Sequence, residues 1–103
     1  SHTMNIGQGD WSRLVRAADE FATPRGLVDK QTGSLMPTSE LRRLRVSYEN
    51  PDAELEIERN TTEVNADITE IHVRIREFDG SGAGQRLKSA FENDVIRAGR
   101  FGE

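Results

Sequence analysis

The apolar residues between Asp10 and Ala22 recur at the spacing of an α-helix. They are Trp11, Leu14, Val15, Ala18 and Phe21, at positions i, i+3, i+4, i+7 and i+10 of one helix face. Asp10 fits the N-cap position, since its carboxylate can accept a hydrogen bond from a first-turn amide. Thr23-Pro24 favours an end there, because the residue before a proline is pushed out of the helical region. The pattern predicts a helix over residues 10–22.

From Leu41 onward the hydrophobic period changes to two, which is typical of half-buried strands. Three runs alternate in this way, with the apolar positions Leu44, Val46 and Tyr48, then Leu55 and Ile57, then Ile71, Val73 and Ile75. Phe78 is expected to complete the apolar face of the third run. Asn50-Pro51-Asp52 has the composition of a tight turn between the first two runs. The runs predict three antiparallel strands joined as a meander.

A second helical pattern closes the chain, and a long connection follows the first helix. The closing pattern places Leu87, Ala90, Phe91, Val95 and Ala98 on one face. Ser81 is its expected N-cap, and Gly99 fits the left-handed residue that often ends a helix. Residues 23–38 contain prolines and glycines without a sustained period, which predicts a long loop.

Taken together, these elements predict an α+β fold with the order α-β-β-β-α. The simplest packing is two layers, with a three-stranded antiparallel sheet packed on two helices. The 103 residues suffice for one domain, assigned to residues 5–103. Ser1-His2-Thr3-Met4 is interpreted as a tag remnant followed by a start methionine and is set aside from the fold.

Composition narrows the function classes. The chain has no cysteine, a net charge of −4 and, outside the segment set aside, the single histidine His72. Paired-histidine or cysteine chemistry is therefore not expected, and neither is a cofactor or a metal. No apolar run approaches the ~20 residues of a membrane span, and no leader is recognisable, so we expect a cytoplasmic protein without a membrane partner.

The face of the sheet that would point away from the helices carries charge in rows of opposite sign. Its predicted residues are Arg43 and Arg45 on the first strand, Glu54, Glu56 and Glu58 on the second, and His72, Arg74 and Arg76 on the third. Antiparallel pairing would bring Glu56 near His72 or Arg74, and would bring Glu54 near Arg74 or Arg76. One interpretation is a self-neutralising, solvated face that helps to fix strand register. The other is a docking surface for an acidic partner or for a second copy of the chain.

Two weaker signals are the glycine-rich turn, which lies outside these charge rows, and His72, which lies within them. The turn between the third strand and the last helix is rich in glycine, and Gly80, Ser81, Gly82, Gly84 and Arg86 form a possible anion-binding site. Its spacing matches no nucleotide-binding motif, and a flexible connection is the alternative. His72 is either a member of the charge rows or a titrating switch, and too few ligands accompany it for a metal site.

The element order over residues 10–98 resembles the YbaB/EbfC nucleoid-associated proteins. The resemblance implies a small acidic bacterial dimer that binds DNA. The residues alone favour a non-enzymatic protein-interaction or assembly module, as a small homo-oligomer or as a subunit of a larger complex. DNA binding through Arg42, Arg43, Arg45, Arg74 and Arg76 is the alternative, and the negative net charge makes it the less favoured one. The identity of the partner and the oligomeric state lie beyond the sequence.

Overall fold

The first helix forms where the sequence predicts it. The computed structural model describes residues 2–30, 45–59 and 68–99. Helix α1 spans Trp11–Ala22, and the Asp10 carboxylate accepts a hydrogen bond of 3.1 Å from the Arg13 amide, as an N-cap does. A short 3-10 helix, η1 (Thr23–Arg25), follows, and it ends at Gly26 with a φ of 70°. Glycine suits this position because a side chain is strained in the left-handed region.

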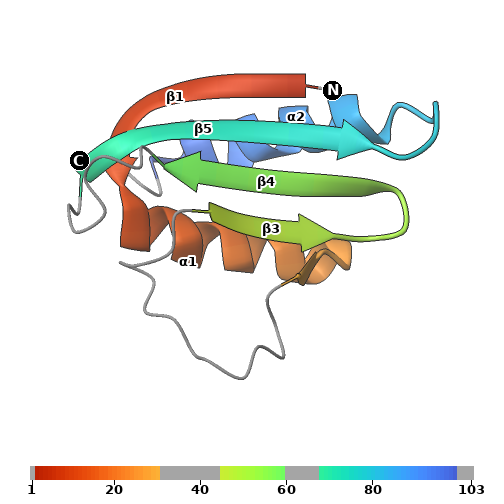
Figure 1. Cartoon of the computed structure of the whole chain (residues 1–103), viewed down its shortest axis with the longest axis horizontal. Helices are drawn as coiled ribbons and strands as arrows, with labels where there is room; N and C mark the ends of the chain where they lie inside the picture. Colours follow the sequence, from red (N-terminus) through yellow and green to blue (C-terminus); the bar gives the residue numbers. More distant parts are fainter. Residues whose placement is uncertain (1, 31–44, 60–67, 100–103) are drawn as a thin grey trace.

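The described residues form a sheet of five strands, all antiparallel to their neighbours, and not the predicted three. They are β1 (His2–Asp10), β2 (Val28–Asp29), β3 (Arg45–Glu49), β4 (Ala53–Arg59) and β5 (Ile68–Glu77). Their order across the sheet is β1-β5-β4-β3-β2, so that the first strand lies beside the last one (Figure 1). The predicted meander is present as β3-β4-β5.

The two additional strands lie where the sequence predicted none. Strand β1 begins at His2, so part of the segment that was set aside as a tag remnant pairs with β5. Strand β2 and helix η1 fall within the predicted loop 23–38, and residues 31–38 lie outside the described residues. The element order is thus β-α-β-β-β-β-α, so the α-β-β-β-α order behind the family resemblance is wrong.

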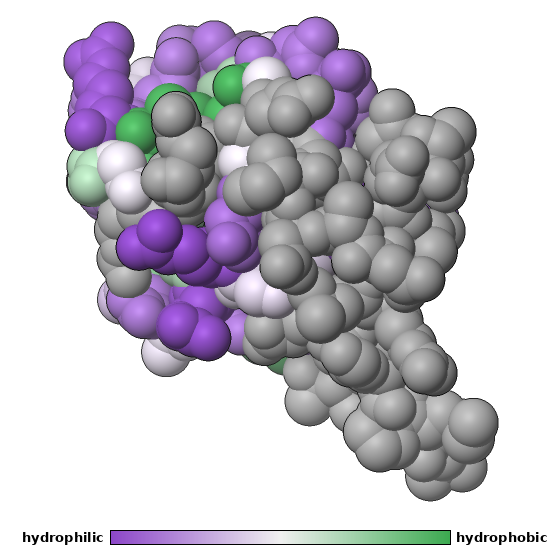
Figure 2. All heavy atoms as spheres, turned by 90° about the vertical axis from the view of Figure 1, so that its left-hand side faces the viewer, coloured by the Kyte–Doolittle hydropathy of each residue, from purple (hydrophilic) through white to green (hydrophobic). Residues whose placement is uncertain are grey.

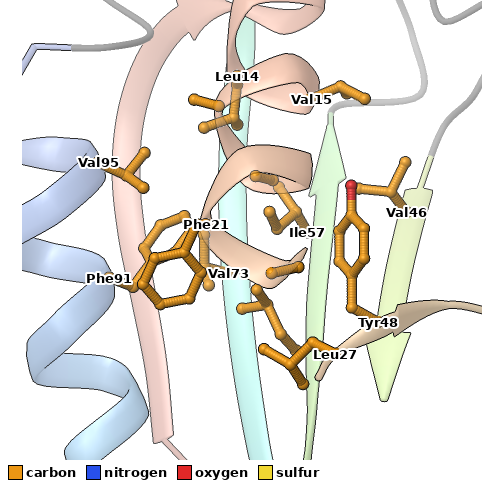
Figure 3. Close-up of a cluster of buried hydrophobic side chains, with 14 of the residues drawn as sticks. Leu14, Val15, Phe21, Leu27, Val46, Tyr48, Ile57, Val73, Phe91 and Val95 are labelled. Carbon is orange, nitrogen blue, oxygen red and sulfur yellow. The ribbon is translucent and has the colours of Figure 1, made fainter. Parts of the chain in front are cut away.

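Both helices lie on the same side of the sheet (Figure 1). The inward strand positions and the apolar face of α1 form one hydrophobic cluster, which includes Leu14, Val46, Leu55, Ile57 and Val73. Figure 3 shows the rings of Phe21 and Phe91 against each other, and their planes are nearly perpendicular with centroids 5.3 Å apart. Edge-to-face packing of this kind fixes the last helix against α1.

The closing helix begins slightly later than the sequence predicts. Helix α2 spans Ala83–Phe91 and continues as a π-helix, η4 (Glu92–Ile96), so that Phe91 and Val95 are both buried. Its N-cap is Gly82, in the left-handed region, and not Ser81. Phe78 was expected on the apolar face, but its side chain is 45% exposed. Period-two alternation explains this, because position 78 falls on the same face as positions 72, 74 and 76.

Candidate functional site

The face of the sheet opposite the helices carries the predicted charge rows. The pairing of β4 with its neighbours aligns Glu54 with Arg76, Glu56 with Arg74, and Glu58 with His72. Of the two registers left open by the sequence, this is the one that pairs Glu56 with Arg74 and Glu54 with Arg76. We refer to Arg45, Glu54, Glu56, Glu58, His72, Arg74 and Arg76 as the charged face.

Two glutamates of β4 are each held between two cations, and three of the four cations lie on the neighbouring strands β3 and β5. Glu56 pairs with Arg74 of β5 at 2.5 Å and with Arg45 of β3 at 3.3 Å. Glu54 pairs with Arg76 of β5 at 3.0 Å and with Lys30, which directly follows β2, at 2.7 Å. Cross-strand pairs of opposite charge stabilise a sheet and fix its register. The rows therefore form two clusters that lie next to each other on β4, one of Arg45, Glu56 and Arg74 and the other of Lys30, Glu54 and Arg76.

The two signs of this network are not equally accessible. The side chains of Glu54 and Glu56 are only 9% and 14% exposed, because the longer basic side chains cover them. Arg45, Arg74 and Arg76 are 55%, 54% and 57% exposed. A partner that approaches the middle of the charged face therefore meets guanidinium groups first.

The environment of Glu54 shifts two pKa values in opposite directions. The hydrogen bond from the Lys30 ammonium is the largest cause that lowers the pKa of the Glu54 carboxyl, and the positive charges of Lys30 and Arg76 act in the same direction. The same hydrogen bond raises the pKa of Lys30 above its usual value. The stabilisation from Glu54 is therefore present above the ordinary carboxyl pKa and is lost as the pH falls through the lowered value. The contribution from Lys30 is present below its usual pKa and is lost at strongly alkaline pH.

We expect Glu54→Gln to lower the free energy of unfolding by about 2 kcal/mol, because a nearly buried acceptor of charge-assisted hydrogen bonds is lost. Glu58→Gln is the matched control, since Glu58 is exposed and has no ion pair among the described residues; its effect should stay within about 0.5 kcal/mol. Urea unfolding followed by circular dichroism measures both values. Equal effects of the two substitutions would contradict the role assigned to Glu54. The difference between the Glu54→Gln variant and the wild type should also shrink as the pH falls below about 4.

A shallow hollow of about 290 Å³ lies beside Arg74, over β1, β5 and β4. It exists because β1 places the short Thr3 and Asn5 side chains opposite Arg74 and His72. Glu58 and His72 line it as well, and the His72 Nε2 lies 3.2 Å from the Glu70 carboxylate. The hollow therefore offers donors and acceptors side by side, next to the exposed guanidinium of Arg74.

Phe78 adds an exposed aromatic ring to the same surface. The Arg76 guanidinium lies 5.7 Å from the centre of this ring, within the range of a cation–π contact. Arginine and aromatic side chains are enriched where proteins bind other proteins.

Figure 2 views the molecule from the end where α1 begins and shows hydrophilic residues over most of the coloured surface, with a small hydrophobic group near the top.

Backbone amides of the glycine-rich turn already donate hydrogen bonds to carboxylates of the same chain. The Gly82 amide donates to Glu77 at 3.1 Å, and the Ser81 amide donates to Asp79 at 3.1 Å. Hydrogen bonds from Ser81 lower the pKa of Asp79, which keeps this carboxylate ionised. The Arg86 guanidinium donates to the Ser81 carbonyl. An anion would have to displace these carboxylates, and the anion site at Gly80, Ser81, Gly82, Gly84 and Arg86 stays a prediction.

Some members of the surface were missed by the sequence, and one predicted member is not placed. Lys30 lay in the predicted loop, and Thr3 lay in the excluded segment, so neither was assigned to the sheet. Asn5 was not assigned to a strand, although Met4 and Ile6 alternate with Thr3 and Asn5 in a strand-like period. Arg43 lies outside the described residues.

The part of the chain that the structure describes offers neither a metal-binding cluster nor a membrane-spanning helix. Among residues 2–30, 45–59 and 68–99, no group of three or more His, Cys, Asp or Glu side chains is arranged to hold a metal ion. No helix within these ranges has the length and apolar character needed to cross a membrane.

Comparison with known proteins gives this chain no relative. No family model, no curated protein and no solved structure matches it.

Proposed function

We propose that this chain is a non-enzymatic protein-interaction module, working as a homo-oligomer or as a subunit of a larger complex, and that the charged face is its docking surface. The observation that carries the proposal is that the two paired glutamates are covered, whereas the arginines that pair with them are exposed; Glu58, which has no ion pair among the described residues, is exposed as well. Arg45, Arg74 and Arg76 are each more than half exposed, whereas Glu54 and Glu56 are nearly buried beneath them.

The glutamates hold the arginines in position without using up their donors. A guanidinium carries five N–H donors in a rigid plane. Among the described residues, Arg74 and Arg76 each have one ion pair, with Glu56 and Glu54 respectively. Within the described part of the chain, no other ion pair takes up the remaining donors, so they can meet a partner's carboxylates. A side chain that is already ordered also loses less entropy on binding.

The partner that fits this surface is an acidic protein segment. Exposed guanidinium groups attract carboxylates and speed association with them. Phe78 adds apolar contact area beside Arg76, and the hollow at Thr3 and Asn5 gives the surface relief into which a side chain can fit. The proposal therefore concerns a mixed charged and aromatic contact.

Fluorescence anisotropy with a short glutamate-rich peptide tests this function. We expect saturable binding that weakens when NaCl is raised from about 0.05 M to about 0.5 M, since salt screens exposed charges. A lysine-rich peptide of equal length is the control and should not bind. No binding of the acidic peptide at low salt, or equal binding of both peptides, would contradict the proposal.

DNA binding is the second candidate, and the three exposed arginines on one face favour it. Nucleic acid carries a phosphate on every nucleotide, so its binding must weaken steeply with salt. The same anisotropy measurement with a duplex in place of the peptide separates the two. Tighter binding to the duplex than to the acidic peptide, with a steep salt dependence, would replace the first proposal with this one.

A further inference from the structure

Strand β1 forms a long open edge of the sheet. It spans His2–Asp10 and pairs with β5 on one side, and no other described strand lies on its other side (Figure 1). An edge strand presents unpaired backbone amides and carbonyls, which can pair with another strand. The opposite edge differs, because β2 has only the two residues Val28–Asp29.

The residues of β1 lack the charges that usually protect an edge. The run from Thr3 to Gly9 contains no charged residue and no proline, in a chain of which 31% of the residues are charged. Natural edge strands are commonly blocked by lysine, proline or a bulge. Of these devices β1 has only a bulge, between Asn5 and Gly7, and the strand pairs with β5 on both sides of it.

An uncharged edge is suited to a second copy of itself. When a strand pairs antiparallel with its own copy about a twofold axis, each charged residue near the axis faces a like charge, which is destabilising. The run from Thr3 to Gly9 avoids this conflict, whereas Arg45, Arg74 and Arg76, the exposed arginines of the charged face, all carry the same sign. The uncharged edge of β1 is therefore better suited to a contact between copies than the charged face is.

We propose that β1 pairs antiparallel with β1 of a second copy and forms a continuous ten-stranded sheet. This inference rests on the proposed function, since it names the surface through which the module assembles. A twofold axis perpendicular to the sheet places the helices of both copies on one side and both charged faces on the other. The hollow at Thr3 and Asn5 reaches β1, so the two hollows would adjoin across the axis and form one broader docking surface.

The substitution Asn5→Asp tests this pairing with little change of shape. It adds one negative charge to each copy of β1, and the two new carboxylates face each other or lie diagonally across the axis. Within one copy, residue 5 lies opposite His72 and shares the hollow with Glu56 and Glu58, so the stability of the Asn5→Asp variant is measured alongside its dimerisation. Gln85→Glu on helix α2 is the matched control, because it also converts an exposed amide into a carboxylate away from the edge.

Sedimentation equilibrium over a range of protein concentrations measures the dimer. We expect the wild type and Gln85→Glu to dimerise equally, and Asn5→Asp to raise the dimer dissociation constant about tenfold. High salt should restore most of this loss, because it screens the repulsion. A chain that begins at Met4 should also dimerise, since the rest of the edge remains. Circular dichroism confirms that each variant is folded.

Several outcomes would overturn the inference: a wild type that stays monomeric, an Asn5→Asp variant that dimerises like the wild type, or a chain from Met4 that is monomeric. The proposed function fails separately. If the protein is a monomer that binds the acidic peptide, only the proposed β1 pairing is contradicted. If it is a dimer that does not bind the peptide, only the proposed docking surface is contradicted.

Discussion

Replacing Trp11 with alanine is expected to lower the free energy of unfolding by about 4 kcal/mol. Trp11 is fully buried as the first residue of α1, where its ring packs in the core. The Arg59 guanidinium, itself buried at the end of β4, lies 5.1 Å from the centre of the ring. The substitution therefore creates a cavity and also removes the aromatic face beside a buried cation. Since small domains have only about 5–15 kcal/mol of stability, the variant should be marginally folded.

Urea unfolding followed by circular dichroism measures this change, because Trp11 is the only tryptophan and its fluorescence is lost with it. Arg16→Ala is the control on the same helix, since Arg16 is exposed, and it should change stability by less than about 0.5 kcal/mol. A loss below about 1 kcal/mol for Trp11→Ala would show that Trp11 does not anchor α1 to the sheet.

Reversing two charges of the charged face is expected to abolish binding of the acidic peptide. In Arg74→Glu/Arg76→Glu, two exposed donors become two carboxylates beside Glu54 and Glu56. The attraction for an acidic partner then turns into repulsion, and the affinity should fall by at least about 100-fold. Fluorescence anisotropy with the glutamate-rich peptide measures the loss.

A milder pair of substitutions guards against a loss that comes from unfolding. In Arg74→Gln/Arg76→Gln, Glu56 keeps its pair with Arg45 and Glu54 keeps its pair with Lys30, so the sheet retains its network. This variant should bind about tenfold more weakly than the wild type while unfolding cooperatively. Arg13→Gln/Arg16→Gln, on the exposed face of α1, removes the same charge and should bind normally. If Arg74→Gln/Arg76→Gln and Arg13→Gln/Arg16→Gln lose equal affinity for the peptide, net charge and not the charged face determines binding.

The parts of the fold with strong local patterns could be predicted from the sequence. Helix α1 carries five apolar residues at helical spacing and a capping Asp10, so its position follows from local chemistry alone. The register of β4 and β5 was narrowed to two choices by matching Glu54 and Glu56 with basic partners. In this region the charge pattern and the apolar alternation favour the same pairing.

The remaining parts depend on contacts that a local pattern does not contain. Strand β2 has only two residues, and its pairing with β3 is what makes it a strand. Lys30, the residue after β2, donates a hydrogen bond to Glu54, which is 24 residues later in the sequence. The first residues of β1, up to Met4, were set aside as a tag remnant and a start methionine, and the rest of β1 was assigned to no strand, although its alternation resembles one. The burial of Glu54 and Glu56 depends on longer side chains lying over them, which strand alternation does not reveal.

The most direct test of the charged face is a titration of ¹⁵N-labelled protein with the glutamate-rich peptide, followed by NMR. We expect the amide shifts to concentrate on β3, β4 and β5, around Arg45, Arg74 and Arg76, and to extend to Phe78. The amides of α1 and α2, on the other side of the sheet, should stay unchanged. Shifts that centre on the helices or on the glycine-rich turn, with β3, β4 and β5 unaffected, would contradict it.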